Sequence, residues 1–424
     1  MKACVYTLGC KVNTYESEYI MARLKESGYQ VTTDINDICD VNIINTCTVT
    51  NQADIKSKKT LKRVRRTNPK AVIVALGCFV EDHQENDLDI DIYVGNKDKS
   101  RIIELLDYYF AKHEPIVKVG EDKDHFDNMF INDFKNRTRA FVKVQDGCEN
   151  FCSYCIIPYV RGKCRSKALE EVIKEVTTLV NNGFQEVVLT GIHTGNYGVD
   201  LNTNFATLLR NLVTIKGLKR LRISSIEITE LTDEVLDIIK DNEVIVNHLH
   251  IPLQAGSNHI LKLMNRKYDL KYFEEKLEKI RSIRNDIAIS TDIIVGFPEE
   301  TDEDFDETLK NSRKFAFTKI HVFPYSERKG TKASTFNHKV DGTIKKERAR
   351  KLLRLSHELE KEYAKKHLNQ SMEVLFEEYK DGLSIGHTSN YLKVKVKEEI
   401  PHNTFKTVLI KDYLLDSLIG EIDE

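Results

Sequence analysis

Residues 140–155, AFVKVQDGCENFCSYC, join a run of apolar and β-branched residues to a short loop that holds Cys148, Cys152 and Cys155. The apolar run predicts a buried strand, so the three thiols are expected in the loop at the end of that strand. Three thiolates on one short loop can bind three irons of a 4Fe–4S cluster and leave the fourth iron without a protein ligand. The stretch therefore predicts an open iron–sulfur cluster beside a strand end.

Zinc is the alternative ligand for these thiols. A structural zinc site needs four ligands, usually from two paired C-x-x-C units. His193 or Cys164 is available to complete such a set, but neither has the usual local spacing. The spacing favours the cluster over zinc.

Five further strands follow the cysteine loop, with helical patterns between them. The six predicted strands are 140–145, 186–189, 220–224, 248–253, 288–294 and 319–323, and the helices include 169–181 and 302–315. Six strand–helix units predict an α/β fold, an incomplete TIM-like (β/α)6 barrel whose strand ends form the active face. A doubly wound open sheet is the other architecture that this alternation allows.

Three cysteines in the first hundred residues also follow predicted buried strands. The strands are 3–8, 41–45 and 71–76, and the cysteines that follow them are Cys10, Cys47 and Cys78. Helical patterns between the strands predict a parallel α/β sheet. Loops after parallel strands gather at one edge, so the three thiols are expected to converge on a shared metal or cluster. The alternative is that each cysteine is a small buried hydrophobic residue.

Two helices are predicted between these strands. In the first, Asn13 is expected as the N-cap, and Gly28 is expected to end the helix. The second, 50–67, carries from Lys56 to Arg66 a run of cations without an acid, which predicts a phosphate-binding surface. Its predicted nucleic-acid contacts are Lys58, Lys59, Lys62, Arg63, Arg65 and Arg66. The alternative is an ordinary solvated helix face.

The chain has 424 residues, which suggests two or three domains. The predicted parts are an N-terminal domain at 1–112, a polar linker at 113–136, a barrel domain at 137–366 and a C-terminal module at 367–424. The formal net charge of −2 excludes a protein that is held to nucleic acid by overall charge, so an RNA contact must come from a local basic patch.

The sequence has neither a long apolar run nor an N-terminal secretory signal, so we expect a cytoplasmic protein without a membrane contact. Nine cysteines in such a chain favour metal ligands or reactive thiols over disulfides.

The CxxxCxxC loop resembles that of the radical S-adenosylmethionine enzymes. The wider string DGCENFCSYCIIPYVRG is similar to their methylthiotransferase branch, as are LTGIHTGNYG, HLHIPLQAGSNHILKLMNR, TDIIVGFPEET and HVFPYSERKGT. The N-terminal strings GCKVN, NTCTVT and ALGC resemble the N-terminal domain of that branch. The match covers nearly the whole chain in the expected order. GCKVN with NTCTVT most resembles the subgroup that modifies N6-threonylcarbamoyladenosine next to the tRNA anticodon.

The resemblance implies that the 4Fe–4S cluster on Cys148, Cys152 and Cys155 binds S-adenosylmethionine through its open iron. One electron then cleaves the sulfonium and yields a 5′-deoxyadenosyl radical, which is chemistry of the cofactor. The resemblance places Tyr154 beside the adenine of the cofactor. Four residues at strand ends that face the same mouth are also predicted to bind the cofactor, with a role in shaping the loops as the alternative: Thr190, Gly191, Ser225 and Gln254. His250 and Arg266 are further candidates, with a structural histidine and a surface arginine as the alternatives.

The resemblance also implies a second 4Fe–4S cluster on Cys10, Cys47 and Cys78, which carries the sulfur to be inserted. One S-adenosylmethionine methylates this sulfur, and another provides the radical that removes hydrogen from C2 of the adenine. The remaining cysteines, Cys4, Cys39 and Cys164, are expected to take no part. The implied partners are tRNA, an electron donor of the flavodoxin or ferredoxin type, and a sulfur source.

A long charged helix at 345–369 and short strands at 372–376, 391–397 and 405–410 predict a small C-terminal β-barrel. By resemblance this is a TRAM domain, an OB-like RNA-binding module. Residues 367–424 hold 6 Lys, no Arg and 11 acids, so the module has a net charge of −5 and binds phosphate poorly as a whole. Strand alternation places Lys393, Lys395 and Lys397 on one side, where they form a local basic face.

Three functions are compatible with these features. The first is a tRNA methylthiotransferase acting on N6-threonylcarbamoyladenosine, which GCKVN and the basic helix favour. The second keeps the enzyme class but changes the target to isopentenyladenosine in tRNA or to an aspartate of a ribosomal protein. The acidic C-terminus favours the ribosomal-protein target, because ribosomal proteins are basic. The third is a non-catalytic iron–sulfur or zinc protein that binds RNA. The polar strand ends around an open cluster speak against the third, and the first is our prediction.

Overall fold

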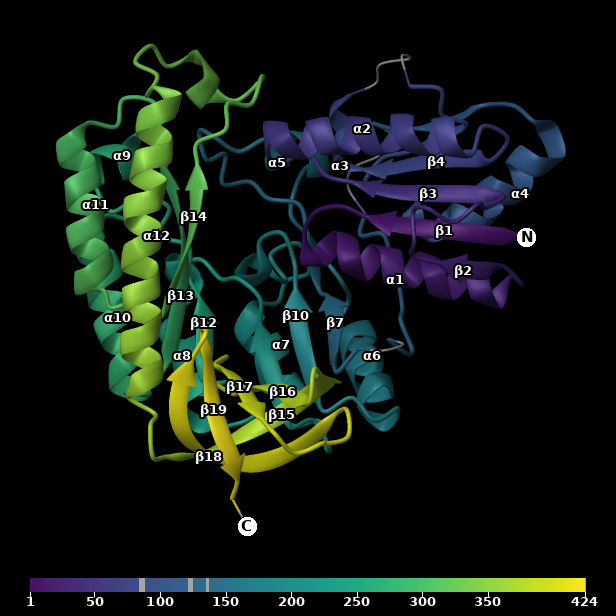
Figure 1. Cartoon of the computed structure of the whole chain (residues 1–424). Coiled ribbons are helices and arrows are strands. Elements are labelled where there is room, and N and C mark those ends of the chain that lie inside the picture. The colour runs from purple at the N-terminus through teal and green to yellow at the C-terminus, as the bar shows by residue number, and fades with distance from the viewer. Residues whose placement is uncertain (84–87, 121–124, 135–136, 424) are drawn as a thin grey trace.

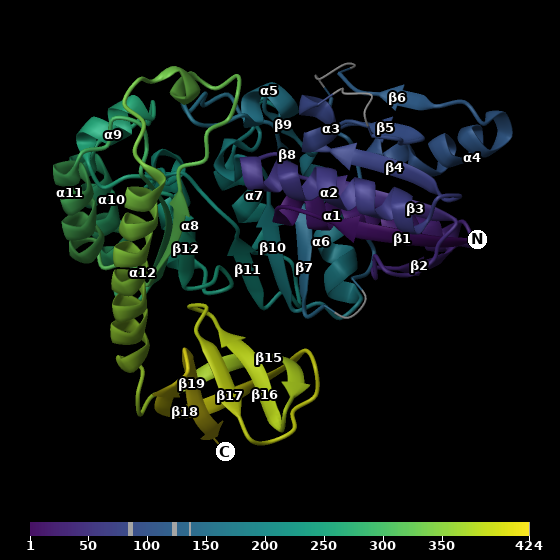
Figure 2. The same cartoon turned by 45° about the horizontal axis from the view of Figure 1, so that its top comes forward.

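The computed structural model describes residues 1–83, 88–120, 125–134 and 137–423. Its N-terminal part is a six-stranded parallel sheet in the order β2-β1-β3-β4-β5-β6 (Figures 1 and 2). The strands are β1 Lys2–Thr7, β2 Gln30–Thr32, β3 Val41–Thr46, β4 Val72–Gly77, β5 Ile92–Val94 and β6 Ile116–Lys118. The helices are α1 Lys11–Glu26, α2 Asn51–Thr67, α3 Cys78–Asp82 and α4 Ile102–Lys112. The parallel α/β sheet predicted from the sequence is confirmed.

Helices cover both faces of this sheet. Helices α1 and α4 pack on one face through residues such as Ile20 and Leu106. Helices α2 and α3 pack on the other through residues such as Leu61 and Phe79. Because both faces are covered, β3 and β4 are buried along their whole length.

Asn13 is not the N-cap of α1, contrary to the sequence prediction. The N-cap is Cys10, whose side chain makes no capping hydrogen bond. Asn13 Nδ2 instead donates to the carbonyl oxygens of Leu8, at 2.7 Å, and Thr46, at 2.9 Å. The amide therefore joins the loops at two strand ends. The predicted end of the helix is confirmed, because Gly28 follows it in the left-handed conformation, at φ +84°.

The segment 113–136, predicted as a linker, also contributes to both neighbouring cores. Its residues 116–118 form β6, which pairs with β5. Met129, Ile131 and Phe134 are buried in the core of the middle part. Residues 121–124 and 135–136 of the predicted linker lie outside the described residues. The segment thus packs on both neighbouring parts through its buried residues, and the domain boundaries stay a prediction.

The middle part has six parallel strands in two sheets, β11-β10-β7 and β12-β13-β14. An isolated parallel bridge between Leu221 and Ile245 links the two sheets. Among the described residues no pairing joins β7 to β14, so the barrel is open on that side. The partial barrel predicted from the sequence is therefore confirmed.

The elements of the middle part surround this barrel. The strands are β7 Arg139–Lys143, β8 Gln145–Asp146, β9 Arg165–Ser166, β10 Glu186–Thr190, β11 Arg220–Ile223, β12 His248–His250, β13 Ala288–Val295 and β14 Lys319–Pro324, of which β8 and β9 form a separate antiparallel pair. The helices are α5 Ile157–Arg161, α6 Leu169–Asn181, α7 Phe205–Leu212, α8 Asp233–Asp241, α9 Asn258–Leu263, α10 Leu270–Ile283, α11 Asp302–Lys314 and α12 Gly342–Lys365.

The inner face of the barrel is polar. Successive strand residues point to opposite faces, and outward residues such as Val187, Leu221 and Leu249 are buried in the core that the barrel shares with its helices. The alternate positions carry Arg139, Glu186, Arg220, Arg222, His248, His250, Ser290, Asp292 and His321. The barrel thus holds a lining of charged and hydrogen-bonding groups.

A buried charge cluster fastens the N-terminal part to the barrel. The carboxylate of Glu16 in α1 lies 2.5 Å from Lys99 Nζ, 3.0 Å from Lys143 Nζ and 3.4 Å from Arg161 Nη1. Burial by itself raises the pKa of Glu16, but the three cations outweigh it and hold the pKa at about 2. Lys143 and Arg161 belong to the middle part, so this one carboxylate holds cations from both parts.

Replacing Glu16 by alanine is expected to destabilise the protein by about 3–5 kcal/mol, because it leaves the fully buried ammonium of Lys99 without its counter-ion, while Lys143 and Arg161 keep Asp146. The measurement is the shift of the urea unfolding transition. Glu18→Ala is the matched control, since Glu18 lies on the same helix and pairs with Arg137 at 2.7 Å near the surface. That surface pair is expected to contribute at most about 1 kcal/mol. An equal, small shift for both variants would contradict the role of Glu16.

The C-terminal part is a closed barrel in the order β15-β16-β17-β19-β18 (Figure 2). Its strands are β15 Ser371–Lys380, β16 Leu383–Thr388, β17 Lys393–Val396, β18 Thr404–Leu414 and β19 Ser417–Ile422. Val394 and Val396 are buried inside it, so Lys393 and Lys395 point outward from β17, as the alternation predicted. The small C-terminal β-barrel is confirmed.

This C-terminal barrel lies against the starts of the middle strands, whose arrowheads point away from it (Figure 1). Arg220 Nη1 donates to the carbonyl oxygen of His387 at 3.0 Å. The guanidinium carbons of Arg222 and Arg139 lie 4.5 and 5.2 Å from the ring centre of Tyr391. Tyr391 therefore closes the barrel at the end opposite the cysteine loop.

Among the residues that the structure describes, no helix is both long and apolar enough to cross a membrane.

Candidate active site

Cys148, Cys152 and Cys155 lie in the loop that follows β8, at the end of the barrel strands. Backbone hydrogen bonds hold this loop: Ser153 N donates to Met264 O at 3.0 Å, and Cys155 N donates to Cys152 O at 2.9 Å. Burial, with the charges of nearby Cys152 and Cys148, raises the pKa of Cys155 to about 12. Three neighbouring thiols resist becoming thiolates together unless a cation is bound between them.

Cys10, Cys47 and Cys78 follow β1, β3 and β4 at one edge of the N-terminal sheet. Burial raises the pKa of Cys47, and the neighbouring Cys78 and Cys10 raise it further. Gly9 has φ +106°, and a Cβ there would lie 3.1 Å from Cys47 Sγ. Glycine thus lets the Cys10 loop approach Cys47. The structure brings together the three thiols that the sequence predicted to converge.

One short helix touches both groups of thiols. The apolar side chains Ile157 and Val160 of α5 pack with Cys78 of the N-terminal group and with Cys148 and Cys155 of the barrel group. The two groups therefore share a wall, and groups bound to them would face the same region of the protein.

Arg161, at the end of α5, is a site residue that the sequence analysis missed. Its side chain is fully buried, and its Nε donates to Cys78 Sγ at 3.2 Å. Its Nη2 donates to Asn13 Oδ1 at 3.0 Å. The available signal was its place in PYVRG, directly after the cysteine loop, but its burial beside a distant thiol depends on how the two parts pack.

Arg266 has a similar contact in the barrel group. Its Nη1 donates to Cys152 Sγ at 3.3 Å, and its guanidinium forms an ion pair with Glu227. The alternative that Arg266 is a surface arginine is therefore wrong, because its side chain is only 3% exposed. Three thiols with a guanidinium donor at one sulfur suit a 4Fe–4S cluster, whose sulfurs accept hydrogen bonds.

His193, considered as a zinc ligand, is also close to the barrel group. Its Nδ1 lies 3.7 Å from Cys148 Sγ, while its Nε2 forms an ion pair with Glu230. A histidine nitrogen is thus near one of the three thiols.

Two protein-family models match parts of this chain. The family described as the Radical SAM superfamily matches residues 142–311, and the uncharacterized protein family UPF0004 matches residues 2–95. The threonylcarbamoyladenosine tRNA methylthiotransferase MtaB of Bacillus subtilis is 44% identical to this chain, over 92% of the chain and 89% of the relative. The chain belongs to the radical S-adenosylmethionine methylthiotransferases.

Two further relatives show the range of this family. The MtaB enzyme of Aquifex aeolicus is 39% identical over 93% of this chain and 96% of its own. The tRNA-2-methylthio-N(6)-dimethylallyladenosine synthase of Acetivibrio thermocellus is 37% identical over 88% and 80%. The relatives are thus named for two different modified adenosines.

Solved structures support the fold of this methylthiotransferase. The radical S-adenosylmethionine methyltransferase TsrM from Kitasatospora setae, with cobalamin and a 4Fe–4S cluster bound, has a TM-score of 0.57 at 13% identity, over 78% of this chain and 77% of that one. The cobalamin-dependent radical enzyme OxsB has a TM-score of 0.52 at 13% identity, over 85% and 56%. At these identities the similarity shows the fold alone.

The residues predicted to bind S-adenosylmethionine lie at one end of the barrel of the methylthiotransferase. Tyr154 is in the cysteine loop, Thr190 ends β10, and Gly191 follows it against Gln145, where an added Cβ would lie 3.1 Å from the side chain. The remaining two are Ser225, just after β11, and Gln254, whose backbone forms a bridge with Ile293. Their contact with the cofactor stays a prediction.

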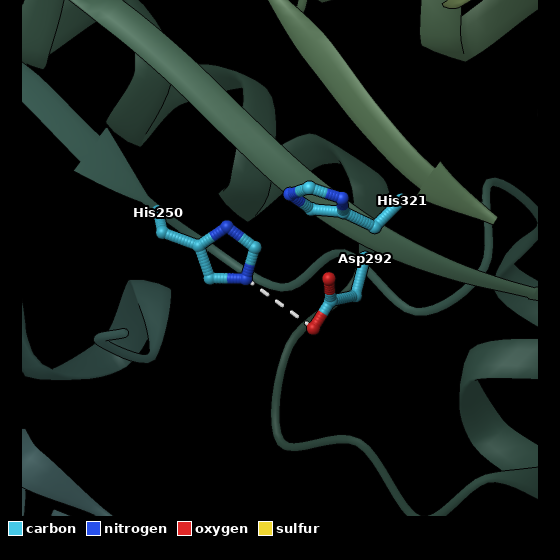
Figure 3. Close-up of side chains that lie close together, drawn as sticks. All are labelled: His250, Asp292 and His321. Atoms are coloured by element: carbon cyan, nitrogen blue, oxygen red, sulfur yellow. Dashed lines mark ion pairs between the residues drawn. The ribbon is translucent and has the colours of Figure 1, made fainter. Parts of the chain in front are cut away.

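His250, the other candidate from the sequence, belongs to a polar wall of the barrel. Its Nδ1 lies 2.9 Å from Ser290 Oγ, and its Nε2 lies 3.3 Å from Asp292 Oδ2 (Figure 3). His321 on β14 completes the wall, with its ring centre 5.6 Å from that of His250. The sequence analysis missed Asp292 and His321, although alternation of polar and apolar residues in β13 and β14 was the signal for them.

Most cations of helix α2 are exposed, but Arg65 packs against the rest of the N-terminal part. Lys59, Lys62, Arg63 and Arg66 are exposed and share one face by their spacing. Lys58 is half-buried. Arg65 faces the fold instead: its Nη2 lies 2.7 Å from Asp91 Oδ2, and its Nε donates to the carbonyl oxygen of Asp89 at 2.9 Å. Arg65 therefore fits a structural role better than its predicted contact with nucleic acid.

Proposed function

We propose that this methylthiotransferase replaces the hydrogen at C2 of N6-threonylcarbamoyladenosine in tRNA with a methylthio group. The observation that carries the proposal is the pair of three-cysteine groups that share α5 as a wall. The relatives named for this nucleoside support the choice of target. When bound, two 4Fe–4S clusters and two S-adenosylmethionine molecules would supply the sulfur, the methyl group and the radical that removes the hydrogen.

The residues of the chain hold, orient and enclose these groups. Cys148, Cys152 and Cys155 would hold the cluster that binds S-adenosylmethionine, and Cys10, Cys47 and Cys78 would hold the cluster that carries sulfur. Arg266 and Arg161 donate hydrogen bonds to one sulfur of each group. The closed end of the barrel at Tyr391 would limit access of water to the reacting atoms. An electron donor of the flavodoxin or ferredoxin type and a sulfur source complete the proposal.

Mass spectrometry of nucleosides from the tRNA of cells that lack this protein tests the target. The methylthio derivative of N6-threonylcarbamoyladenosine is expected to disappear and to return when the gene is restored. Loss of the methylthio derivative of isopentenyladenosine in its place would assign the enzyme to the other tRNA target. Unchanged tRNA nucleosides would overturn the proposal.

The exposed face of α2 is proposed to bind the tRNA backbone. Replacing Lys59, Lys62 and Arg66 by glutamine is expected to weaken tRNA binding and to lower the slope of log K against log salt by about two to three, since each lost phosphate contact removes about 0.7–0.9. Fluorescence anisotropy with labelled tRNA at several salt concentrations measures both effects.

The control variant replaces Lys25, Lys112 and Lys216, which are also exposed, and so removes the same net charge elsewhere. It is expected to bind tRNA with nearly the wild-type salt dependence. If both triple variants change binding equally, α2 has no special role.

A further inference from the structure

The inner face of the barrel forms a polar space between the cysteine loop and Tyr391. Strand alternation places four polar residues on this face: Arg139, Arg222, His250 and Asp292. None of them is among the residues proposed to hold a group bound to the thiols. The ring of Tyr391 packs against Arg222 and Arg139 at the closed end, and 42% of this tyrosine remains exposed. The space is therefore lined by two arginines, a histidine paired with an aspartate, and an accessible phenol.

Arg222 has unused hydrogen-bonding capacity in this space. Its side chain is only 3% exposed, and its Nε donates to Glu186 at 2.8 Å. Its Nη1 and Nη2 are buried without a hydrogen-bond partner. Buried donors without acceptors are unfavourable, and a ligand with two acceptor oxygens, such as a carboxylate, matches the geometry of a guanidinium.

Lys11 brings a third cation to the same space, from the N-terminal part. It is the first residue of α1, directly after Cys10, and its side chain is exposed. It lies one turn before Tyr15, whose hydroxyl donates to Met129 O at 2.7 Å in the middle part, so both side chains are on the helix face toward the barrel. The Lys11 ammonium lies within electrostatic reach of Arg222, Arg139 and Asp292 and of the neutral phenol of Tyr391.

We propose that Lys11 binds the carboxylate of the threonyl group on the target adenosine, with Arg222 and Tyr391 forming the floor of this anion site. This proposal rests on the proposed function and identifies Lys11, Arg222 and Tyr391 as the residues that recognise the substrate. A threonylcarbamoyl group carries one carboxylate, whereas an isopentenyl group carries no charge. A cation beside Cys10 would thus select the acidic nucleoside and hold its base near the cluster that carries sulfur.

Three anticodon stem-loop RNAs test the site in the reconstituted enzyme. The first contains N6-threonylcarbamoyladenosine, the second contains its carboxamide, which has nearly the same shape without the charge, and the third contains unmodified adenosine. Dissociation constants are measured by fluorescence anisotropy for the wild type, Lys11→Gln and Lys11→Arg. Because the three RNAs have the same backbone, their comparison removes the general attraction of RNA to cations.

The wild type is expected to bind the acid about ten- to a hundredfold more tightly than the carboxamide. Lys11→Gln is expected to lose most of this preference, and Lys11→Arg is expected to keep it. Lys25→Gln on the same helix is the control and is expected to keep the full preference. Iron content is compared among the variants, because Lys11 is next to a proposed cluster ligand.

If the wild type binds the RNA with the acid and the RNA with the carboxamide equally well, this measurement alone would overturn the anion site. A full preference in Lys11→Gln would overturn the role of Lys11. Failure of the proposed function is a different result: the wild type would then form no methylthio product on the threonylcarbamoyl stem-loop. If the wild type forms this product but binds the acid and the carboxamide equally, the proposed function stands and the anion site at Lys11 is wrong.

Discussion

Replacement of Cys152 by alanine is expected to abolish reductive cleavage of S-adenosylmethionine, with a loss of at least about a hundredfold. Even a change in the groups around metal ligands typically costs ten- to a hundredfold, and this substitution removes a proposed ligand itself. Cys152 is also the thiol that accepts the hydrogen bond from Arg266. Without it, two thiols remain in the loop, which is too few to hold a cluster with one open iron.

The measurement is the amount of 5′-deoxyadenosine formed by reconstituted enzyme with dithionite as reductant. Cys164→Ala is the matched control, because Cys164 is a buried cysteine close to the same loop, with its Sγ 3.8 Å from Gly147 O. It is expected to cleave S-adenosylmethionine at nearly the wild-type rate. Cleavage by Cys152→Ala at the rate of this control would contradict the assignment of the barrel cysteines.

Replacement of Cys47 by alanine is expected to leave cleavage of S-adenosylmethionine within about twofold of the wild type and to stop methylthio transfer to tRNA. Cys47 is the suitable member of its group because its backbone and side-chain neighbours, Ser57 and Gly9, belong to the N-terminal part. Cys78 is less suitable, since it packs against α5 and accepts a hydrogen bond from Arg161. A change there would also disturb the wall of the barrel group.

Two products of the same reaction are measured for this variant: 5′-deoxyadenosine and the methylthio nucleoside in tRNA. Cys39→Ala, another buried cysteine of the N-terminal part, is expected to form both. Loss of both products in Cys47→Ala would show that the two groups of thiols do not have separate roles.

Most of the fold was predictable because its signals are local. Buried strands appear as short apolar runs, and all six proposed cluster cysteines follow such runs, so their grouping at strand ends needed no knowledge of packing. The start of α1 was not predictable in this way. Asn13 has the sequence features of an N-cap, but its amide bonds the carbonyl oxygens of Leu8 and Thr46, a contact between loops that are distant in the sequence.

The residues that were missed or given another role are those whose contacts come from segments distant in the sequence. Glu16 looks like an ordinary helix-surface acid, yet it is buried by Lys143 and Arg161 of the barrel. Arg65 looks like one more cation of a basic helix, yet Asp91 holds it against the fold. Asp292 and His321 are different, because period-two alternation alone places them on the inner face of a strand.

The iron and inorganic sulfide content of anaerobically reconstituted protein tests the central claim most directly. Two three-cysteine groups that each hold a 4Fe–4S cluster predict about eight irons and eight sulfides per chain, and about four of each after Cys148, Cys152 and Cys155 are all replaced by alanine. One zinc per chain, or four irons in the wild type that vanish in the triple variant, would contradict the claim.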